Sequence, residues 1–189
     1  MTRCLCALML TLVVSTPSAW AVTQPEGMTM HRAAAGEPDS SGWATAISTK
    51  GGFSVRLPVK FSDYTLEVPP SEGDVAKVFV VAGSTVEGIT FTAVRLVYRR
   101  RDGAQHFFSR IERGEGLPHQ GTSLEPRRFV GRRAIDVSLN DGRAIAYARY
   151  VLLEDSLMYL IVEIPADHRD RMESSVARRF LDSLRVPSP

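Results

Sequence analysis

Hydrophobic and polar residues alternate along much of the chain, and a period of two predicts β-strands. Gly51–Pro58 has an apolar side chain at every second position, between two glycines and a proline, which is typical of a short strand. Phe61–Val68 is predicted to be a second strand, and Lys77–Ala82 is apolar on both faces, as expected of a central strand. Gly88–Arg99 alternates but changes phase near Ala93, and we predict a β-bulge there.

The second half of the chain contains a strand meander. Ala134–Leu139 and Arg143–Leu153 flank residues 140–142, whose sequence Asn-Asp-Gly tolerates the positive φ angles of a tight hairpin turn. A second turn leads into Leu157–Ile164, which stops at Pro165. Short turns between successive strands predict antiparallel pairing.

Two stretches follow the helical period of 3.6 residues. We expect Asp102 to cap the first helix, with Gln105 as its reciprocal partner and Gly114 as its end. The second helix is predicted to begin at Asp167. One face of the first helix contains Ala104, Phe108 and Ile111, and one face of the second contains Met172, Val176, Ala177, Phe180, Leu181 and Leu184. The order of elements predicts an α+β domain, an antiparallel sheet with helices packed on it.

The N-terminus has the pattern of a signal peptide. Arg3 precedes an apolar run, Leu5–Val14, and Ala19-Trp20-Ala21 is a small-x-small cleavage pattern. We therefore expect residues 1–21 to be removed after Ala21, leaving a periplasmic protein with no membrane span. Residues 22–42 are rich in Pro, Gly, Ser and charge and are interpreted as a flexible leader, followed by a single domain over residues 43–187.

Charge and cysteine content limit the functions that the chain can have. Both cysteines, Cys4 and Cys6, lie in the predicted signal peptide, so the mature chain has no disulfide, thiol nucleophile or cysteine metal ligand. The net charge is only +2, but arginine is concentrated between Arg99 and Arg149. This concentration has two interpretations: solvated strand faces, or a basic patch for an acidic partner.

The sequence contains no recognisable catalytic motif. It has no Gly-x-Ser-x-Gly elbow, phosphate-binding glycine loop or His-Glu-x-x-His pair. The histidines are scattered and lack the spacing of zinc ligands, so we predict no metal site, no cofactor and no catalytic residue. A serine hydrolase assembled from residues far apart in the sequence is kept as an alternative, because such triads are defined by geometry.

A weak candidate binding surface lies around the first helix and the loop after it. Basic residues flank both, and Phe107 and Phe108 cannot both face one core, so Phe107 is an exposed aromatic candidate. The predicted partner-binding residues are Arg99, Arg100, Arg101, Phe107, Arg127, Arg128, Arg132 and Arg133. Nucleic acid is excluded as the partner by the expected periplasmic location.

The chain resembles the PsbP-like superfamily. The resemblance rests on Trp43, Gly51–Val55 and Pro58 at the start of the domain, and on Leu157–Val162 and Arg179–Leu184 at its end. It implies an antiparallel sheet between helices, an α/β/α sandwich, and it extends to small bacterial envelope proteins. A role in photosystem assembly is not implied, because the leader differs from that of the photosynthetic members.

The resemblance implies a non-catalytic periplasmic protein that binds another envelope protein or assists its assembly. One alternative is a protein that binds an anion or an anionic envelope polymer through its arginines, and a second is an unrecognised hydrolase. Fold alone does not decide among these functions.

Overall fold

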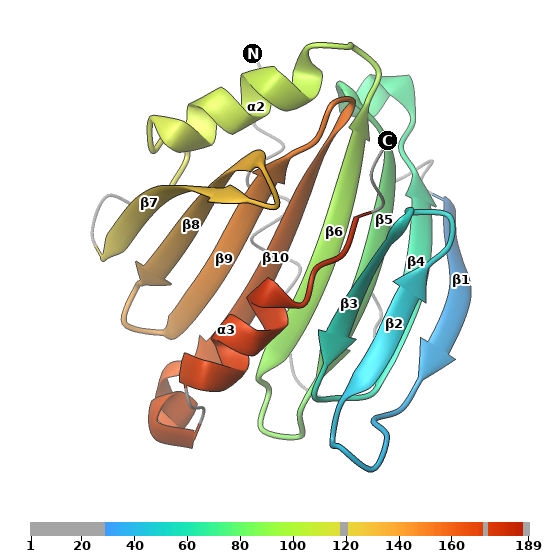
Figure 1. Cartoon of the computed structure of the whole chain (residues 1–189). Coiled ribbons are helices and arrows are strands. Elements are labelled where there is room, and N and C mark those ends of the chain that lie inside the picture. Colours follow the sequence, from blue (N-terminus) through green and yellow to red (C-terminus); the bar gives the residue numbers. More distant parts are fainter. Residues whose placement is uncertain (1–28, 118–120, 172–173, 187–189) are drawn as a thin grey trace.

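Eight antiparallel strands form the main sheet of the protein. The computed structural model describes residues 29–117, 121–171 and 174–186. Across the sheet the order is β1-β4-β5-β6-β10-β9-β8-β7, and every neighbouring pair is antiparallel (Figure 1). In that order the strands are β1 (Thr29–Gly36), β4 (Phe61–Glu67), β5 (Val75–Ser84), β6 (Thr90–Tyr98), β10 (Ser156–Pro165), β9 (Ala144–Leu152), β8 (Arg132–Asn140) and β7 (Thr122–Phe129).

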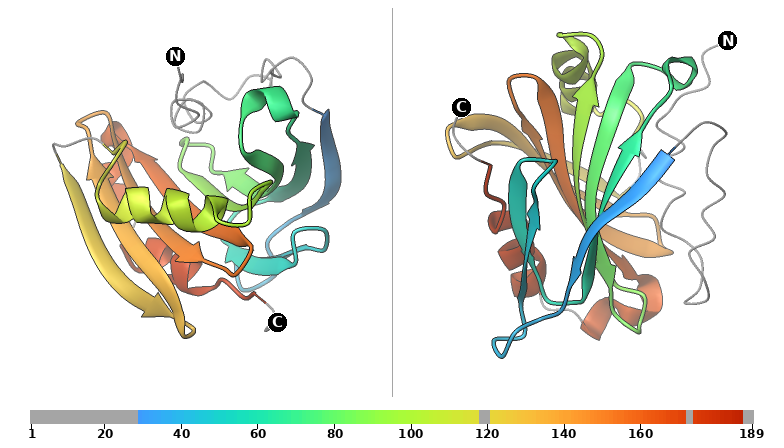
Figure 2. Two further views of the ribbon diagram at one scale, coloured as in Figure 1. Left: turned by 90° about the horizontal axis from the view of Figure 1, so that it is seen from above. Right: turned by 90° about the vertical axis from the view of Figure 1, so that its right-hand side faces the viewer.

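The two faces of the sheet are covered by different elements. Helix α2 (Gly103–Glu112) crosses one face, and helix α3 (Ser174–Asp182) lies on the other beside a hairpin of β2 (Ala44–Ser48) and β3 (Phe53–Leu57) (Figure 2). Two short 3₁₀ helices, Pro70–Glu72 and Ala166–Arg171, complete the described elements. The predicted α+β class with an antiparallel sheet is confirmed. The predicted α/β/α sandwich is not confirmed, because one outer layer combines α3 with a hairpin.

Each face of the sheet has its own hydrophobic core. Between the sheet and the α3 layer, Phe53, Phe91 and Phe180 pack in one cluster. Between the sheet and α2, a second cluster includes Phe108 and Leu96. The alternation of side chains along the central strands therefore supplies both cores, as the apolar character of β5 predicts.

The opening strand of the domain is not part of the main sheet. β3 pairs with β2 on one edge, and its other edge is joined to the chain after α3 by reciprocal backbone hydrogen bonds between Ser54 and Arg185, both 2.9 Å. Ser183 closes the same edge, because its hydroxyl accepts a hydrogen bond from the Arg56 amide at 2.9 Å. The two ends of the domain thus meet in one layer, although β3 does not belong to the sheet that they cover.

The predicted bulge near Ala93 is wrong. β6 pairs with β10 in an unbroken register from Thr90 to Val97. The phase change has another cause: Phe91 and Ala93 are buried in the α3-side core, whereas Val94 and Leu96 are buried in the α2-side core. The buried face changes along the strand because α2 covers only the far end of β6.

The starts of both helices differ from those expected, whereas one predicted turn is confirmed. Asp102 precedes α2 but makes no capping hydrogen bond, because its carboxylate accepts hydrogen bonds from Arg100 instead. Residues 166–171 form a 3₁₀ turn, so the second α-helix begins at Ser174 and not at Asp167. The 140–142 turn is as predicted, with Gly142 at φ 81° between the paired strands β8 and β9.

Strands β1 and β7 have no apolar periodicity that predicts them. β1 lies within residues 22–42, the stretch interpreted as a leader, yet it pairs with β4 from Thr29 to Gly36. β7 lies largely in the loop expected after the first helix. Both are edge strands, whose backbone hydrogen bonds to a neighbouring strand do not require a buried face. β7 also carries Pro126 and several charges, features that discourage further strand pairing.

Candidate functional site

The predicted arginines do not form one surface. Arg127 and Arg132 pair across β7 and β8 with Ala134 and Phe129, whose side chains pack in the α3-side core. Because side chains alternate along a strand, Arg128 and Arg133 lie on the opposite face. There Arg133 binds Glu112 at the end of α2, with contacts of 2.6 and 2.7 Å. The hairpin therefore divides these four arginines between the two faces of the sheet.

The Arg99–Arg101 triplet is also divided in its roles. Arg99 donates hydrogen bonds to three backbone carbonyls near the connection between β4 and β5, those of Gly73 (2.6 Å), Val68 and Val75. Arg100 forms an ion pair with Asp102 at 2.9 Å, and its hydrogen bond lowers the pKa of that carboxyl group. Arg101 is exposed. Arg99 is thus a structural residue, and we expect its replacement to lower the stability of the fold.

Replacing Arg99 with serine should destabilise the protein by about 1–2 kcal/mol, because partly buried carbonyl oxygens lose a charged donor. Arg101→Ser, which removes the same charge two residues later, should change the free energy of unfolding by no more than about 0.5 kcal/mol. Urea melts of both variants measure the difference. Equal free energies of unfolding would contradict the assigned role of Arg99.

Phe107 is not a free aromatic anchor. Its ring lies 6.4 Å from that of Tyr98, and it packs against the α2-side core, half-buried. Phe108 is fully buried beneath the guanidinium of Arg133, whose Cζ lies 5.2 Å from the ring centroid. The aromatic residues of α2 therefore stabilise its docking on the sheet.

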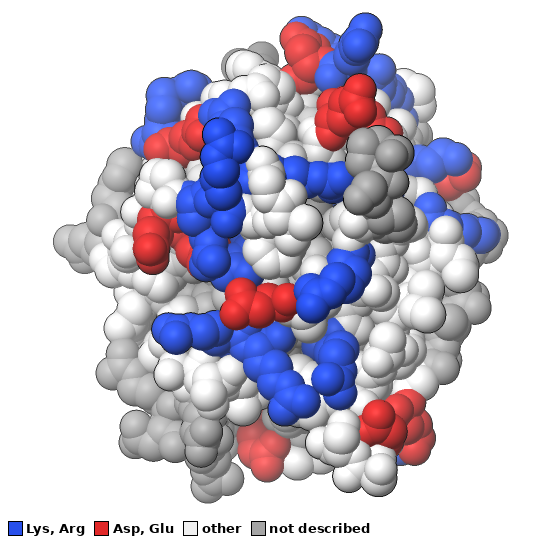
Figure 3. All heavy atoms as spheres, viewed as in Figure 1, with Lys and Arg blue, Asp and Glu red and all other residues white. Residues whose placement is uncertain are grey.

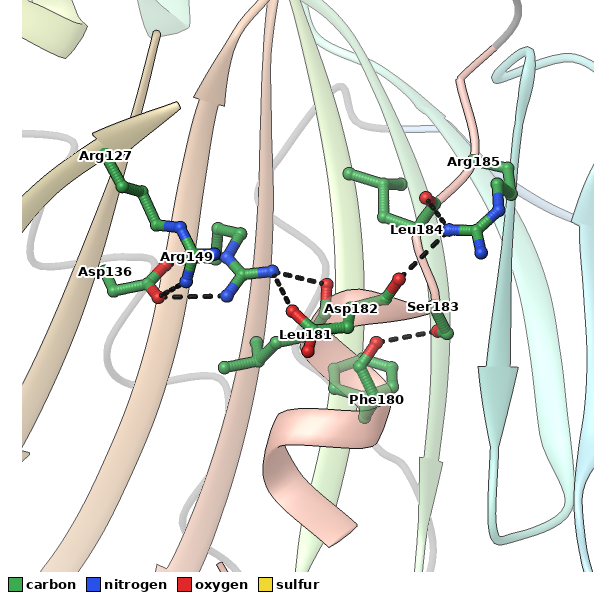
Figure 4. A network of polar contacts seen from close by, with 9 residues as sticks. All are labelled: Arg127, Asp136, Arg149, Phe180, Leu181, Asp182, Ser183, Leu184 and Arg185. Carbon is green, nitrogen blue, oxygen red and sulfur yellow. Dashed lines mark hydrogen bonds and ion pairs between the residues drawn. The ribbon is translucent and has the colours of Figure 1, made fainter. Parts of the chain in front are cut away.

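On the other face, Arg149 joins α3 to the sheet (Figure 4). It is 1% exposed, and it binds Asp136 of β8 at 2.7 and 2.9 Å and Asp182 of α3 at 2.6 Å. It also donates to the Leu181 carbonyl oxygen at 3.1 Å. Arg127 binds Asp136 from β7 at 2.6 Å. This network fixes the end of α3 against three strands.

The ionised form of Asp136 is favoured within this network. Desolvation by the protein raises its pKa, but hydrogen bonds from Arg149 and Arg127 outweigh that effect, so the pKa lies below its usual value of 3.8. Desolvation likewise opposes the charge on Arg149, and its two carboxylate partners raise its pKa. Both groups are charged at neutral pH, and they hold α3 in place.

The basic surface beside this network consists of arginines that pair with no carboxylate. We call the surface formed by Arg56, Arg178, Arg179 and Arg185 the α3 surface. Among the described residues, none of these four has a carboxylate oxygen within 4 Å, whereas Arg95, Arg110 and Arg133 elsewhere each form an ion pair. Figure 3 shows basic side chains gathered across this face. The four arginines come from β3, α3 and the segment after α3, which the fold brings together.

Sequence reasoning missed this surface, although part of the signal was present. Arg178 and Arg179 are recognisable as residues on the polar half of the second helix. Their proximity to Arg56 was not predictable, because it depends on the β2–β3 hairpin packing beside α3. The concentration of arginine between Arg99 and Arg149 therefore indicated a different part of the chain, in which several arginines already pair with carboxylates.

A cavity of about 260 Å³ lies where β8, β9 and β10 approach the start of α3. Its polar lining comes from Ser138, Asn140, Tyr147 and Ser174. Its described lining includes no histidine and no carboxylate, so a serine there has no adjacent base.

Two other carboxylates with altered pKa values do not form a pair. Burial raises the pKa of Asp63, which accepts a hydrogen bond from Ser48 at 3.0 Å on the α3 side of the sheet. Burial also raises the pKa of Glu163, which is hydrogen-bonded to Thr90 at 3.3 Å on the α2 side. Since they lie on opposite faces, the two groups are not arranged as the acid and base of one active site.

Within residues 29–117, 121–171 and 174–186, no group of three His, Cys, Asp or Glu side chains is placed to hold a metal ion. His106 is exposed on α2 and His168 lies 3.8 Å from Asp167. His119 lies outside the described residues. No helix in the described part of the chain is both long and apolar enough to cross a membrane.

Several solved structures match this fold, among them two at low sequence identity. One is the solution structure of cyanobacterial PsbP (CyanoP) from Synechocystis sp. PCC 6803, at a TM-score of 0.45 and 14% identity over 77% of this chain and 92% of that chain. The other is LpqN, described as involved in cell envelope biogenesis of Mycobacterium tuberculosis, at a TM-score of 0.35 and 12% identity over 85% and 92%. No family model and no curated protein matches the chain. The first of the two structures is a PsbP protein, and PsbP belongs to the superfamily that the sequence resembles. At these values the resemblance concerns the arrangement of the chain and not its activity or partners.

Proposed function

We propose that the chain is an exported, non-catalytic protein that binds another protein of the cell envelope through the α3 surface. The observation that carries this proposal is the contrast between its arginines. Arg95, Arg110 and Arg133 are neutralised by carboxylates of this chain, whereas the four of the α3 surface have no carboxylate partner among the described residues. Unneutralised arginines on a surface attract and orient an acidic partner.

The rigidity of the surface supports the same function. α3 is held by the Arg149 network, and β3 is joined to the segment after α3 by backbone hydrogen bonds. Arginines on such a scaffold lose less conformational freedom on binding than arginines in a mobile loop, which favours affinity. The predicted signal peptide, residues 1–21, supports an envelope location for the partner.

Site-specific photo-crosslinking in intact cells tests the proposal. A benzophenone amino acid at position 178 should give one discrete protein adduct on irradiation, because this position lies on the α3 surface. The same group at His106, which is exposed on the opposite face, is the matched control and should not give that adduct.

Two outcomes would contradict the proposal. Equal adducts from positions 178 and 106, or none from position 178, would show that the α3 surface does not contact a protein. A heterogeneous adduct that resists protease digestion would instead favour the alternative, an anionic envelope polymer.

A further inference from the structure

Trp43 contacts two arginines of the α3 surface. The Cζ atom of Arg179 is 4.2 Å from the centroid of the indole ring, and that of Arg56 is 5.9 Å away. Trp43 precedes β2, Arg56 belongs to β3 and Arg179 belongs to α3. Tertiary packing therefore brings the three residues together. Trp43 itself is 6% exposed and packs in the α3-side core. It is therefore a rigid base on which the guanidinium groups rest.

Stacking on an aromatic ring leaves the hydrogen-bond donors of a guanidinium unused. The ring contacts the flat face of the group, whereas its five N–H donors lie in the plane and point outward. Arg179 is exposed and makes no ion pair within the described part of the chain. The contact with Trp43 restricts the guanidinium, and its donors are available to a ligand that accepts two parallel hydrogen bonds.

Arg56 also has donor capacity that its own chain leaves unused. Its Nε is buried and has no hydrogen-bond partner among the described residues. One terminal nitrogen makes a long hydrogen bond of 3.4 Å to the Ser41 hydroxyl. Asp39 accepts hydrogen bonds from Ser41 at 2.5 and 2.7 Å, which lower the pKa of its carboxyl group, and the charge of Arg56 lowers it further. Its carboxylate thus forms no ion pair with Arg56.

We infer that Trp43, Arg56 and Arg179 form a subsite that binds a carboxylate of an aspartate or glutamate on the partner protein. The inference rests on the proposed function and specifies its contact chemistry. The guanidinium of Arg179 supplies two parallel donors, and Arg56 adds a second positive charge from the neighbouring strand. The contact with Trp43 restricts Arg179 before the partner arrives, which lowers the entropic cost of binding.

The fluorescence of Trp43 gives a direct measurement. The sequence contains two tryptophans, and Trp20 lies in the predicted signal peptide, so Trp43 is the sole tryptophan of a chain that begins at Val22. The probe is an eight-residue peptide in which glutamate and alanine alternate, and the control probe has glutamine in place of glutamate. The acidic peptide should change the fluorescence of Trp43 saturably and bind more weakly as salt rises, whereas the glutamine peptide should have no effect.

Variants of Arg179 separate charge from geometry. Arg179→Gln should weaken peptide binding by about tenfold or more, since a charge-assisted pair of hydrogen bonds is lost. Arg179→Lys keeps the charge but not the planar fork, and it should also bind more weakly than the parent. Arg101→Gln is the charge-matched control on another part of the surface and should bind within about twofold of the parent, since distant exposed charges are largely screened.

The inference is overturned if the parent does not bind the acidic peptide, if both peptides bind alike, or if Arg179→Gln binds as the parent does. Tighter binding of inorganic polyphosphate at equal charge would overturn it in favour of a phosphate polymer. The proposed function is tested separately. A position-178 adduct that persists unchanged in the Arg179→Gln variant removes the subsite but keeps the partner, whereas absence of that adduct in the parent removes the partner itself.

Discussion

Phe180→Ala is expected to cost about 3–5 kcal/mol in free energy of unfolding, because it empties a fully buried site in the core between α3 and the sheet. The ring of Phe180 meets that of Phe91 edge-on, with centroids 5.4 Å apart and an interplanar angle of 77°, a favourable aromatic geometry. Phe53→Ala, on β3 in the same core, should cost a similar amount. Against a typical total of about 5–15 kcal/mol, either change brings the domain close to unfolding.

The neighbouring residue provides the control. Arg179→Ala should cost only about 0.5–1 kcal/mol, the value of an exposed cation–π contact with Trp43. From the sequence alone no more than about 0.5 kcal/mol is expected for a residue on the polar half of the helix. Denaturant melts give the three values. Equal losses for Phe180→Ala and Arg179→Ala would show that the buried face of α3 is wrongly assigned.

Asp136→Asn is expected to cost about 3 kcal/mol at neutral pH, because it leaves the buried guanidinium of Arg149 with only one carboxylate partner. The same substitution at Asp155, whose side chain is 69% exposed beside Arg95, is the control and should cost less than about 1 kcal/mol. Urea melts at pH 7 measure both. A similar small loss at the two sites would show that the network does not hold α3.

The pH dependence of stability tests the same network independently. Since the pKa of Asp136 is lower in the folded state than its usual value of 3.8, its contribution is complete above that value and is lost as pH falls through the lower, folded-state pKa. The parent should therefore lose stability on acidification below about pH 5, and Asp136→Asn should lose less over that range. Parallel pH profiles would contradict the assigned role of the Asp136 carboxylate.

Alternation and helical periodicity predicted those elements that bury a face. β3, β5, β10 and the apolar faces of both helices follow directly from their side chains, because burial selects apolar residues at regular spacing. β1 and β7 were not predictable in this way. Their pairing depends on backbone groups, which every residue has, and on a neighbouring strand that the local sequence does not specify.

The change of phase at Ala93 shows how a local rule fails when a strand is covered unequally. A bulge and a change of covering layer both shift the apolar positions by one residue. Only the position of α2, which covers Val94 and Leu96, distinguishes them. The alternation along Gly88–Arg99 therefore predicted the strand but not the helix that lies across it.

The candidate site was harder to predict than the fold. Counting arginines located Arg99 and Arg133, whose charges are used within the chain. The unpaired arginines come from segments more than a hundred residues apart, such as Arg56 and Arg179. The sequence gives the number of arginines in a region, but only the folded structure shows which of them have no carboxylate partner.

The central claim is that the arginines of the α3 surface serve partner binding and not stability. The most direct measurement compares the Arg178→Gln, Arg179→Gln double variant with the parent in two assays, a urea melt and crosslinking to the envelope partner from an exposed position nearby. We predict a change of no more than about 1 kcal/mol in free energy of unfolding together with loss of most of the adduct. A stable variant that retains the full adduct, or one that unfolds while its partner contact is unaffected, would contradict the claim.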